Sequence, residues 1–108
     1  RDGRKVIGTA YKTTLDDAAS PTSAELAFIP VNYTNLVMDY TLTNNTQTRN
    51  GKLNIAQSGG MYVWNDEYSE TGDTQFFLNV NSSTGDIEYM TTTVDGTIDF
   101  FYGFVYFD

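Results

Sequence analysis

The chain has 108 residues, 15% of them aromatic, and contains neither cysteine nor histidine. This composition fits one folded domain, excludes disulfides and catalysis by thiolate or imidazole, and disfavours zinc and copper sites. Fourteen acidic residues against six basic ones give a formal net charge of −8, which disfavours nucleic acid and anionic membranes as partners because both carry negative charge.

The first predicted element is a strand. β-branched and aromatic residues recur in short runs between turn-forming residues, a pattern typical of an all-β protein. Residues 4–15 form the first such run, with Gly8 as a candidate bulge. Residues 16–28 contain Pro21, which limits any helix to a single turn near residues 22–26.

The middle of the chain predicts two strands joined by a long turn. Residues 34–43 alternate between apolar and polar types, which indicates a strand with one buried face. That face would hold Leu36, Met38, Tyr40 and Leu42. The segment NNTQTRNG at 44–51 consists of turn formers, so we expect a turn there before a strand at 52–57.

Four further strands are expected at 61–68, 74–80, 87–93 and 97–108, separated by turns rich in Gly, Ser and Asp. In the second of these, alternation places Phe76, Leu78 and Val80 on one face. Seven or eight strands at regular spacing predict an antiparallel β-sandwich, jelly-roll-like, with little or no helix. We expect a single sandwich domain over residues 23–108, preceded by an N-terminal strand or lead-in segment over residues 1–22. The missing initial Met favours a mature product or a fragment of a longer protein.

The last strand, TIDFFYGFVYFD, is apolar on both faces beyond Asp99. One face would carry Phe100, Tyr102, Phe104 and Tyr106, and the other Phe101, Gly103, Val105 and Phe107. A strand of a sandwich has only one face in the core, and an apolar face left in water is rare in monomers. We therefore expect the first set in the core and the second buried between subunits about a threefold axis, with Gly103 allowing a neighbouring backbone to approach.

Acidic residues offer two chemical alternatives, a calcium site and a pair of catalytic carboxylates. The segment 65–73 contains four candidate calcium ligands, Asp66, Glu67, Glu70 and Asp73. Their spacing does not match an EF-hand loop, so a solvated hairpin turn without metal is favoured. A glycosidase would need two facing carboxylates, for which Asp39, Glu88 and Asp99 are the strand-borne candidates. Nothing in their spacing singles out a pair, so no catalytic residue and no cofactor are assigned.

Tyr62 and Trp64 lie two residues apart on one expected strand and therefore share a face. Adjacent exposed aromatic rings can stack on sugar rings. Because large aromatic residues are mostly buried, a place in the core or an interface is favoured for Trp64. Glycan binding through Tyr62 and Trp64 is the alternative function.

From residue 16 onward, the chain carries a series of strand and turn motifs, DYTL at 39–42, RNG at 49–51, GKLNIA at 51–56, NDEYSETGD at 65–73 and YMTTT at 89–93. In this order they resemble a module of structural proteins from tailed bacteriophages and prophages. The resemblance implies a non-enzymatic β-sandwich on the virion surface, in a tail fibre, head fibre or capsid decoration, often trimeric. Implied partners are further copies of the chain, other virion proteins and a host surface glycan. The aromatic, acidic last strand departs from the module's usual pattern and fits a packed interface.

Overall fold

The computed structural model describes residues 4–16, 22–23, 33–44, 46–92 and 98–107, with side chains except those of 4–10, 23 and 107. Within these ranges the chain forms eight strands and no helix, which confirms the all-β prediction. The strands are β1 (Arg4–Leu15), β2 (Thr22–Ser23), β3 (Asn35–Asn44), β4 (Gln47–Ser58), β5 (Met61–Glu70), β6 (Phe76–Val80), β7 (Ile87–Thr91) and β8 (Ile98–Phe107). Of the helical turn expected at 22–26, residues 22 and 23 form β2, and 24–26 lie outside the described residues.

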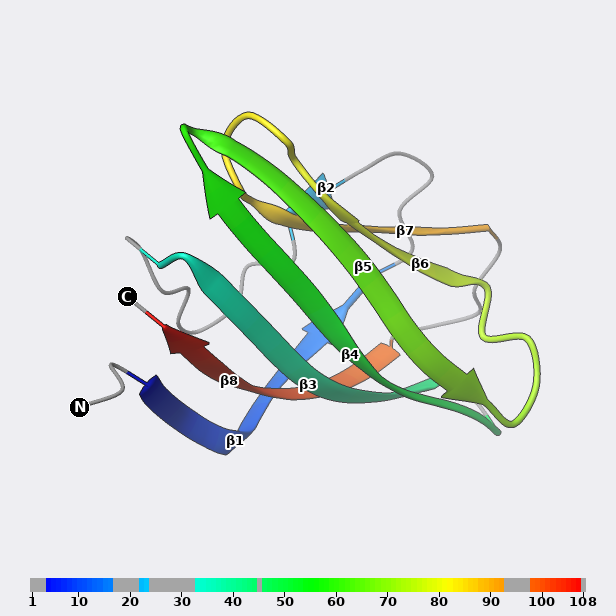
Figure 1. The fold of residues 1–108 in the computed structure, drawn as a ribbon. Helices are drawn as coiled ribbons and strands as arrows, with labels where there is room; N and C mark the ends of the chain where they lie inside the picture. Colours follow the sequence, from blue (N-terminus) through cyan, green and yellow to red (C-terminus); the bar gives the residue numbers. More distant parts are fainter. Residues whose placement is uncertain (1–3, 17–21, 24–32, 45, 93–97, 108) are drawn as a thin grey trace.

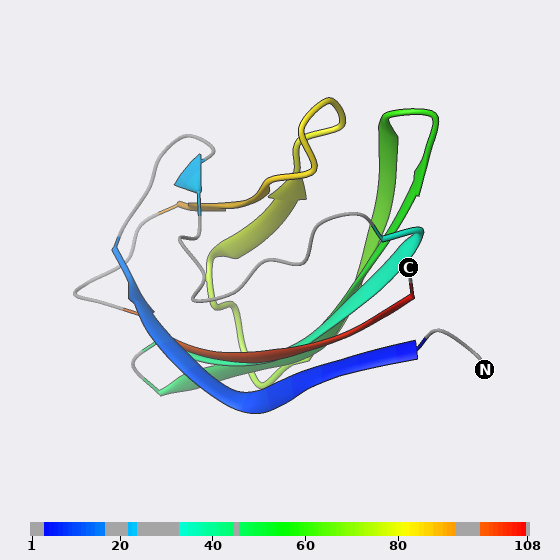
Figure 2. The same ribbon diagram turned by 90° about the vertical axis from the view of Figure 1, so that its left-hand side faces the viewer.

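The strands form two antiparallel sheets, one of five strands in the order β1-β8-β3-β4-β5 and one of three in the order β2-β7-β6 (Figure 1). Figure 2 shows the larger sheet curving around the smaller one, as expected for a β-sandwich. The pairs β1·β8 and β2·β7 are nested as in a jelly roll. The topology departs from a jelly roll because β3, β4 and β5 form a meander within one sheet.

The core lies between the two sheets and is filled largely by aromatic rings. The alternation expected in β3 is confirmed, since Leu36, Met38, Tyr40 and Leu42 are all buried. Across the sandwich, β6 buries its predicted face of Phe76, Leu78 and Val80. The ring of Phe100 lies 5.5 Å from that of Tyr40 and 6.0 Å from that of Phe76, so it joins the two sheets. Such aromatic contacts add about 0.5–1.5 kcal/mol each beyond the area they bury.

The two faces of β8 differ as the sequence predicts. Phe100, Tyr102 and Phe104 are at most 1% exposed and fill the core. Phe101 points to the opposite face and is 41% exposed. Tyr106 is half-buried against the core, while the side chain of Phe107 lies outside the described residues. Because β8 lies between β1 and β3, both of its edges are paired.

β1 is an edge strand of the larger sheet and pairs with β8 from Arg4 to Leu15. The register shifts between Ile7 and Tyr11, a stretch that includes Gly8, so the ladder is irregular at the predicted bulge. No helix in the described part of the chain is long and apolar enough to cross a membrane.

The turn predicted at 44–51 is wrong for most of its length. β3 continues to Asn44 and β4 begins at Gln47, so the connection is only two residues long. Gln47–Gly51 are strand although their residue types favour turns, because Arg49 is buried and Gly51 pairs with Tyr40. β5 likewise continues to Glu70, so most of the acidic segment 65–73 is strand and not a solvated turn.

Candidate functional site

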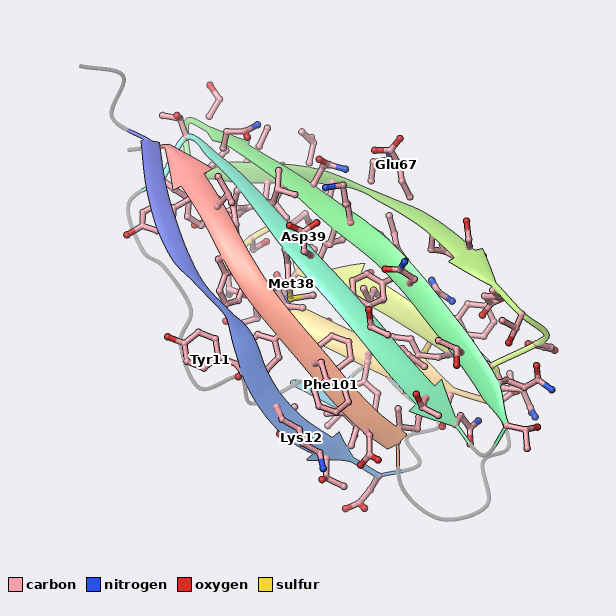
Figure 3. All side chains as sticks on the ribbon, turned by 90° about the horizontal axis from the view of Figure 1, so that it is seen from below. Tyr11, Lys12, Met38, Asp39, Glu67 and Phe101 are labelled. Atoms are coloured by element: carbon pink, nitrogen blue, oxygen red, sulfur yellow. The ribbon has the colours of Figure 1, made fainter. Side chains whose placement is uncertain are left out.

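The outer face of the larger sheet, the face turned away from the smaller sheet, is the candidate site (Figure 3). Phe101 points outward from β8 and is exposed, with Lys12 lying over part of its ring. Val105 is half-buried and pairs across strands with Val37, which is also half-buried. Gly103 pairs with Asp39, is buried, and contributes no side chain to this face. Three of the four predicted interface residues are therefore placed on this face.

Charged pairs lie beside the apolar residues of the outer face and also between them, because Asp39 pairs with Gly103, midway between Phe101 and Val105 on β8. Lys12 Nζ lies 5.6 Å from the centre of the Phe101 ring and 3.7 Å from a carboxylate oxygen of Asp99. Lys52 Nζ donates to Asp39 Oδ1 at 2.9 Å. These pairs are exposed, and such pairs typically contribute at most about 1 kcal/mol.

A shallow depression of about 500 Å³ lies on the outer face between β3, β4 and β5. Its lining includes Asp39, Asn50, Lys52, Glu67 and Ser69. Both of its carboxylates have partners, because Asp39 accepts from Lys52 and Glu67 accepts from Asn54 at 3.0 Å. The depression therefore offers no free pair of carboxylates.

The three glycosidase candidates do not come together. Asp39 and Asp99 share the outer face, but Asp99 pairs with Thr43, four residues from Asp39 along β3 and thus about 13 Å away. Glu88 lies in the smaller sheet, where it accepts from Asn79 at 2.7 Å.

A buried arginine lies at the margin of the core, between the two sheets. The side chain of Arg49 is 3% exposed. Its Nε donates to the Tyr40 hydroxyl at 3.0 Å, and its Nη atoms donate to the Phe76 carbonyl and to Asp66. Tyr40 in turn donates to the second oxygen of Asp66 at 2.8 Å. A buried guanidinium is tolerated only when it is paired in this way.

Two further residues complete this arginine cluster, formed by Tyr40, Arg49, Asp66, Tyr68 and Glu70. Glu70 Oε2 lies 3.4 Å from Arg49 Nη1, and the Tyr68 ring stacks 3.5 Å from the guanidinium carbon. Burial raises the pKa of Tyr40, and the bond to Asp66 adds to this. Burial alone would lower the pKa of Arg49, but its contacts with Tyr40 and Asp66 outweigh that effect and raise it. The Arg49 guanidinium stays charged and its partners are all within the protein, so the cluster is a structural element.

Gly51 allows the arginine cluster to form. A Cβ atom at this position would lie 2.9 Å from the Tyr40 hydroxyl, 2.7 Å from the Glu67 carbonyl and 2.8 Å from Tyr68 Cβ. These separations are too short for a side chain, so glycine is required for β4, β5 and Tyr40 to pack at this distance. The motifs DYTL, RNG and NDEYSETGD, far apart in the sequence, thus supply one structural unit.

The predicted calcium candidates do not converge. Alternation along β5 sends Asp66 and Glu70 to Arg49 and sends Glu67 to the outer face. Asp73 lies in the next loop, where it accepts from the Gln75 backbone at 2.9 Å. Nowhere in the described ranges do three such ligand side chains cluster.

Tyr62 and Trp64 share a face of β5 as predicted, but their environments differ. The Tyr62 ring lies 6.3 Å from that of Tyr33 and packs so closely on Gly85 that a Cβ there would come within 2.6 Å of it. Trp64 is 38% exposed. The two rings therefore do not form a continuous exposed platform.

Comparison with protein-family models, curated proteins and solved structures finds no match for this chain.

Proposed function

We propose that the chain is a non-enzymatic structural domain of a tailed-phage virion surface, in a fibre tip or a capsid decoration. It assembles with copies of itself, as a trimer, through the outer face of the larger sheet. The phage setting rests on the motif resemblance over residues 16–108. The assembly role rests on Phe101, which is 41% exposed on a face where Val37 and Val105 lie side by side.

The shape and composition of the outer face support this role. A broad sheet face with an exposed phenylalanine and two half-buried valines gives apolar contact area that a second sheet or strand can cover. The charged pair of Lys12 with Asp99 would lie at the rim, and that of Lys52 with Asp39 would lie within the contact, between Phe101 and the two valines. Lys52 and Lys12 would thereby limit repulsion between chains that each carry a net charge of −8.

The acidic groups support a structural rather than a catalytic role. Asp66 and Glu70 are committed to Arg49. Asp39 and Glu88 each have a cross-strand partner. Chemistry on a glycosidic bond would need two carboxylates facing one another across a cleft, an arrangement that these residues do not form.

Sedimentation equilibrium of the wild type and of Phe101→Asp tests the assembly role. We expect the wild type to sediment as a trimer at micromolar concentration and the variant as a folded monomer. Phe77→Asp is the matched control, because Phe77 is 47% exposed on the opposite side of the molecule, in the smaller sheet. A monomeric wild type, or equal dissociation by both variants, would contradict the proposal.

Glycan binding is the second candidate, and the exposure of Trp64 favours it. It ranks lower because Tyr62 is packed against Tyr33 and Gly85. Trp64 is the only tryptophan of the chain, so its fluorescence reports directly on this surface. A saturable change in fluorescence with an oligosaccharide, lost in Trp64→Ala, would establish this function.

A further inference from the structure

The outer edge of β5 has open backbone positions. In the described part of the chain no strand pairs with β5 on the side away from β4. The Tyr62 amide points to that side and donates to the Ser82 carbonyl at 3.1 Å. Because backbone groups alternate along an antiparallel strand, those of Trp64, Asp66 and Tyr68 point to the same side. The stretch Trp64–Tyr68 is therefore available to a further strand.

Exposed apolar side chains concentrate on this same strand. Six large hydrophobic residues in the described ranges are exposed, and four of them lie on β5, namely Met61, Val63, Trp64 and Tyr68. A regular, apolar, unpaired edge strand is a template for pairing with another chain. Pairing here would cover both the backbone groups and these side chains.

Charge decides which strand fits. Two β5 strands paired antiparallel about the middle of Trp64–Tyr68 would place Asp66 or Glu67 of one copy opposite the same residue of the other. Like charges directly opposite each other destabilise a sheet. The β5 edge therefore favours a basic strand over a second β5.

The other edge of the same sheet supplies such a strand. β1 contains Arg4, Lys5 and Lys12, three of the six basic residues of the chain. Beyond its irregular stretch β1 pairs regularly from Tyr11 to Leu15, which equals Trp64–Tyr68 in length. The two edges are visible on opposite sides of the sheet in Figure 3.

We propose that β1 of a second copy pairs with the β5 edge, so that the larger sheets of neighbouring copies join edge to edge. β1 and β5 run in the same direction because four antiparallel steps separate them, so this junction is parallel. Matching the regular stretch Tyr11–Leu15 to Trp64–Tyr68 in this direction places Lys12 of the second copy next to Asn65. Lys12 then lies diagonally across from Glu67, on the same face of the joined sheet.

Head-to-tail contacts of this kind generate a closed ring or an open filament, depending on the rotation between neighbours. The β1–β5 junction is separate from the contact proposed at Phe101 and does not depend on it. A chain that uses both surfaces would assemble in two directions.

Cross-linking tests the junction in a chain that has no native cysteine. Thr14→Cys on β1 and Ser69→Cys on β5 change exposed positions, so both variants are expected to fold. A short bismaleimide should link the two variants when they are mixed and should link neither variant to itself. Ser83→Cys, exposed in the turn after β6, serves as the control partner for Thr14→Cys and should give no product.

The yield of the mixed product should fall several-fold at high salt, because opposite charges hold the edges together. It should fall likewise when Lys12→Glu is introduced into the Thr14→Cys variant. Self-linking of Ser69→Cys would show that two β5 edges meet, which overturns the proposal. Absence of the mixed product, or an equal yield with Ser83→Cys, would also overturn it. A junction of five paired residues is the weaker of the two contacts, so it is probed by cross-linking well above the micromolar concentration used for sedimentation. Since Phe101→Asp leaves both edges intact, its dissociation at micromolar concentration and the cross-link are independent results.

Discussion

Replacing Asp66 by Asn should strongly destabilise the fold, although Asp66 is one of fourteen acidic residues on a chain with a large negative charge. The Asp66 side chain is 9% exposed and holds a guanidinium that is 3% exposed. Removing one partner of a buried ion pair costs about 3–5 kcal/mol because the other charge is left uncompensated. Glu70 still lies 3.4 Å from Arg49, and an asparagine oxygen can accept a hydrogen bond, so we expect a smaller loss in the free energy of unfolding, about 2–4 kcal/mol.

Glu67 is the matched control for Asp66, because it is the next residue on the same strand and faces the opposite side. Its carboxylate is exposed and accepts one hydrogen bond from Asn54. Glu67→Gln should therefore change the free energy of unfolding by no more than about 0.5 kcal/mol.

Urea unfolding followed by circular dichroism measures both variants. With an m-value of about 1.5 kcal/mol/M, the midpoint of Asp66→Asn should fall by about 1 to 3 M, and that of Glu67→Gln should stay nearly unchanged. A loss in Asp66→Asn that matches the loss in Glu67→Gln would refute the structural role of the arginine cluster.

Three further predictions follow from the packing. Gly51→Ala should cost about 1–3 kcal/mol in urea unfolding, because its Cβ would lie within 3 Å of three atoms, and an unchanged midpoint would mean that β4 and β5 separate easily. Phe104→Asp should abolish the β-sheet signal in circular dichroism, because Phe104 is 1% exposed and the core offers a carboxylate no partner; a folded variant would contradict the assignment of this face to the core. Burial raises the pKa of Tyr33 to about 12, from an ordinary value of 10.0. This pKa shift contributes about 2–3 kcal/mol to the free energy of unfolding below pH 10, and the contribution is lost as the pH rises through 12. In Tyr33→Phe the free energy of unfolding should therefore decline less between pH 10 and 12. An unchanged decline would contradict the burial of the Tyr33 hydroxyl.

The sequence predicts well what depends on local alternation. Which faces of β3, β6 and β8 are buried follows from a period of two residues, and the structure confirms those assignments. The turn at 44–51 fails because residue types describe only local preference. Arg49 lies in a strand because Asp66 and Glu70, 17 and 21 residues later, neutralise its charge, and pairing across strands cannot be read from the segment itself.

The candidate site was likewise predictable from the sequence only in part. The outward position of Phe101 is predicted from alternation and confirmed, whereas burial of that face between subunits stays a prediction. Packing of Tyr62 could not be predicted, because its neighbours Tyr33 and Gly85 come from segments 29 residues before and 23 residues after it. No local signal identifies β5 as an edge strand, since edge position depends on the order of the whole sheet.

The position of β8 has a consequence for how the protein folds. It is the last strand in chain order, yet it occupies the second place in the larger sheet, between β1 and β3. Until β8 has been synthesised, β1 has no partner, and Tyr40 and Phe76 lack the ring of Phe100 that packs between them. Pairing of β1 with β8 closes the longest loop between any two of the described strands, which slows folding. The domain should therefore fold only after its last strand has left the ribosome, and a ribosome-bound chain truncated before Ile98 should remain sensitive to protease.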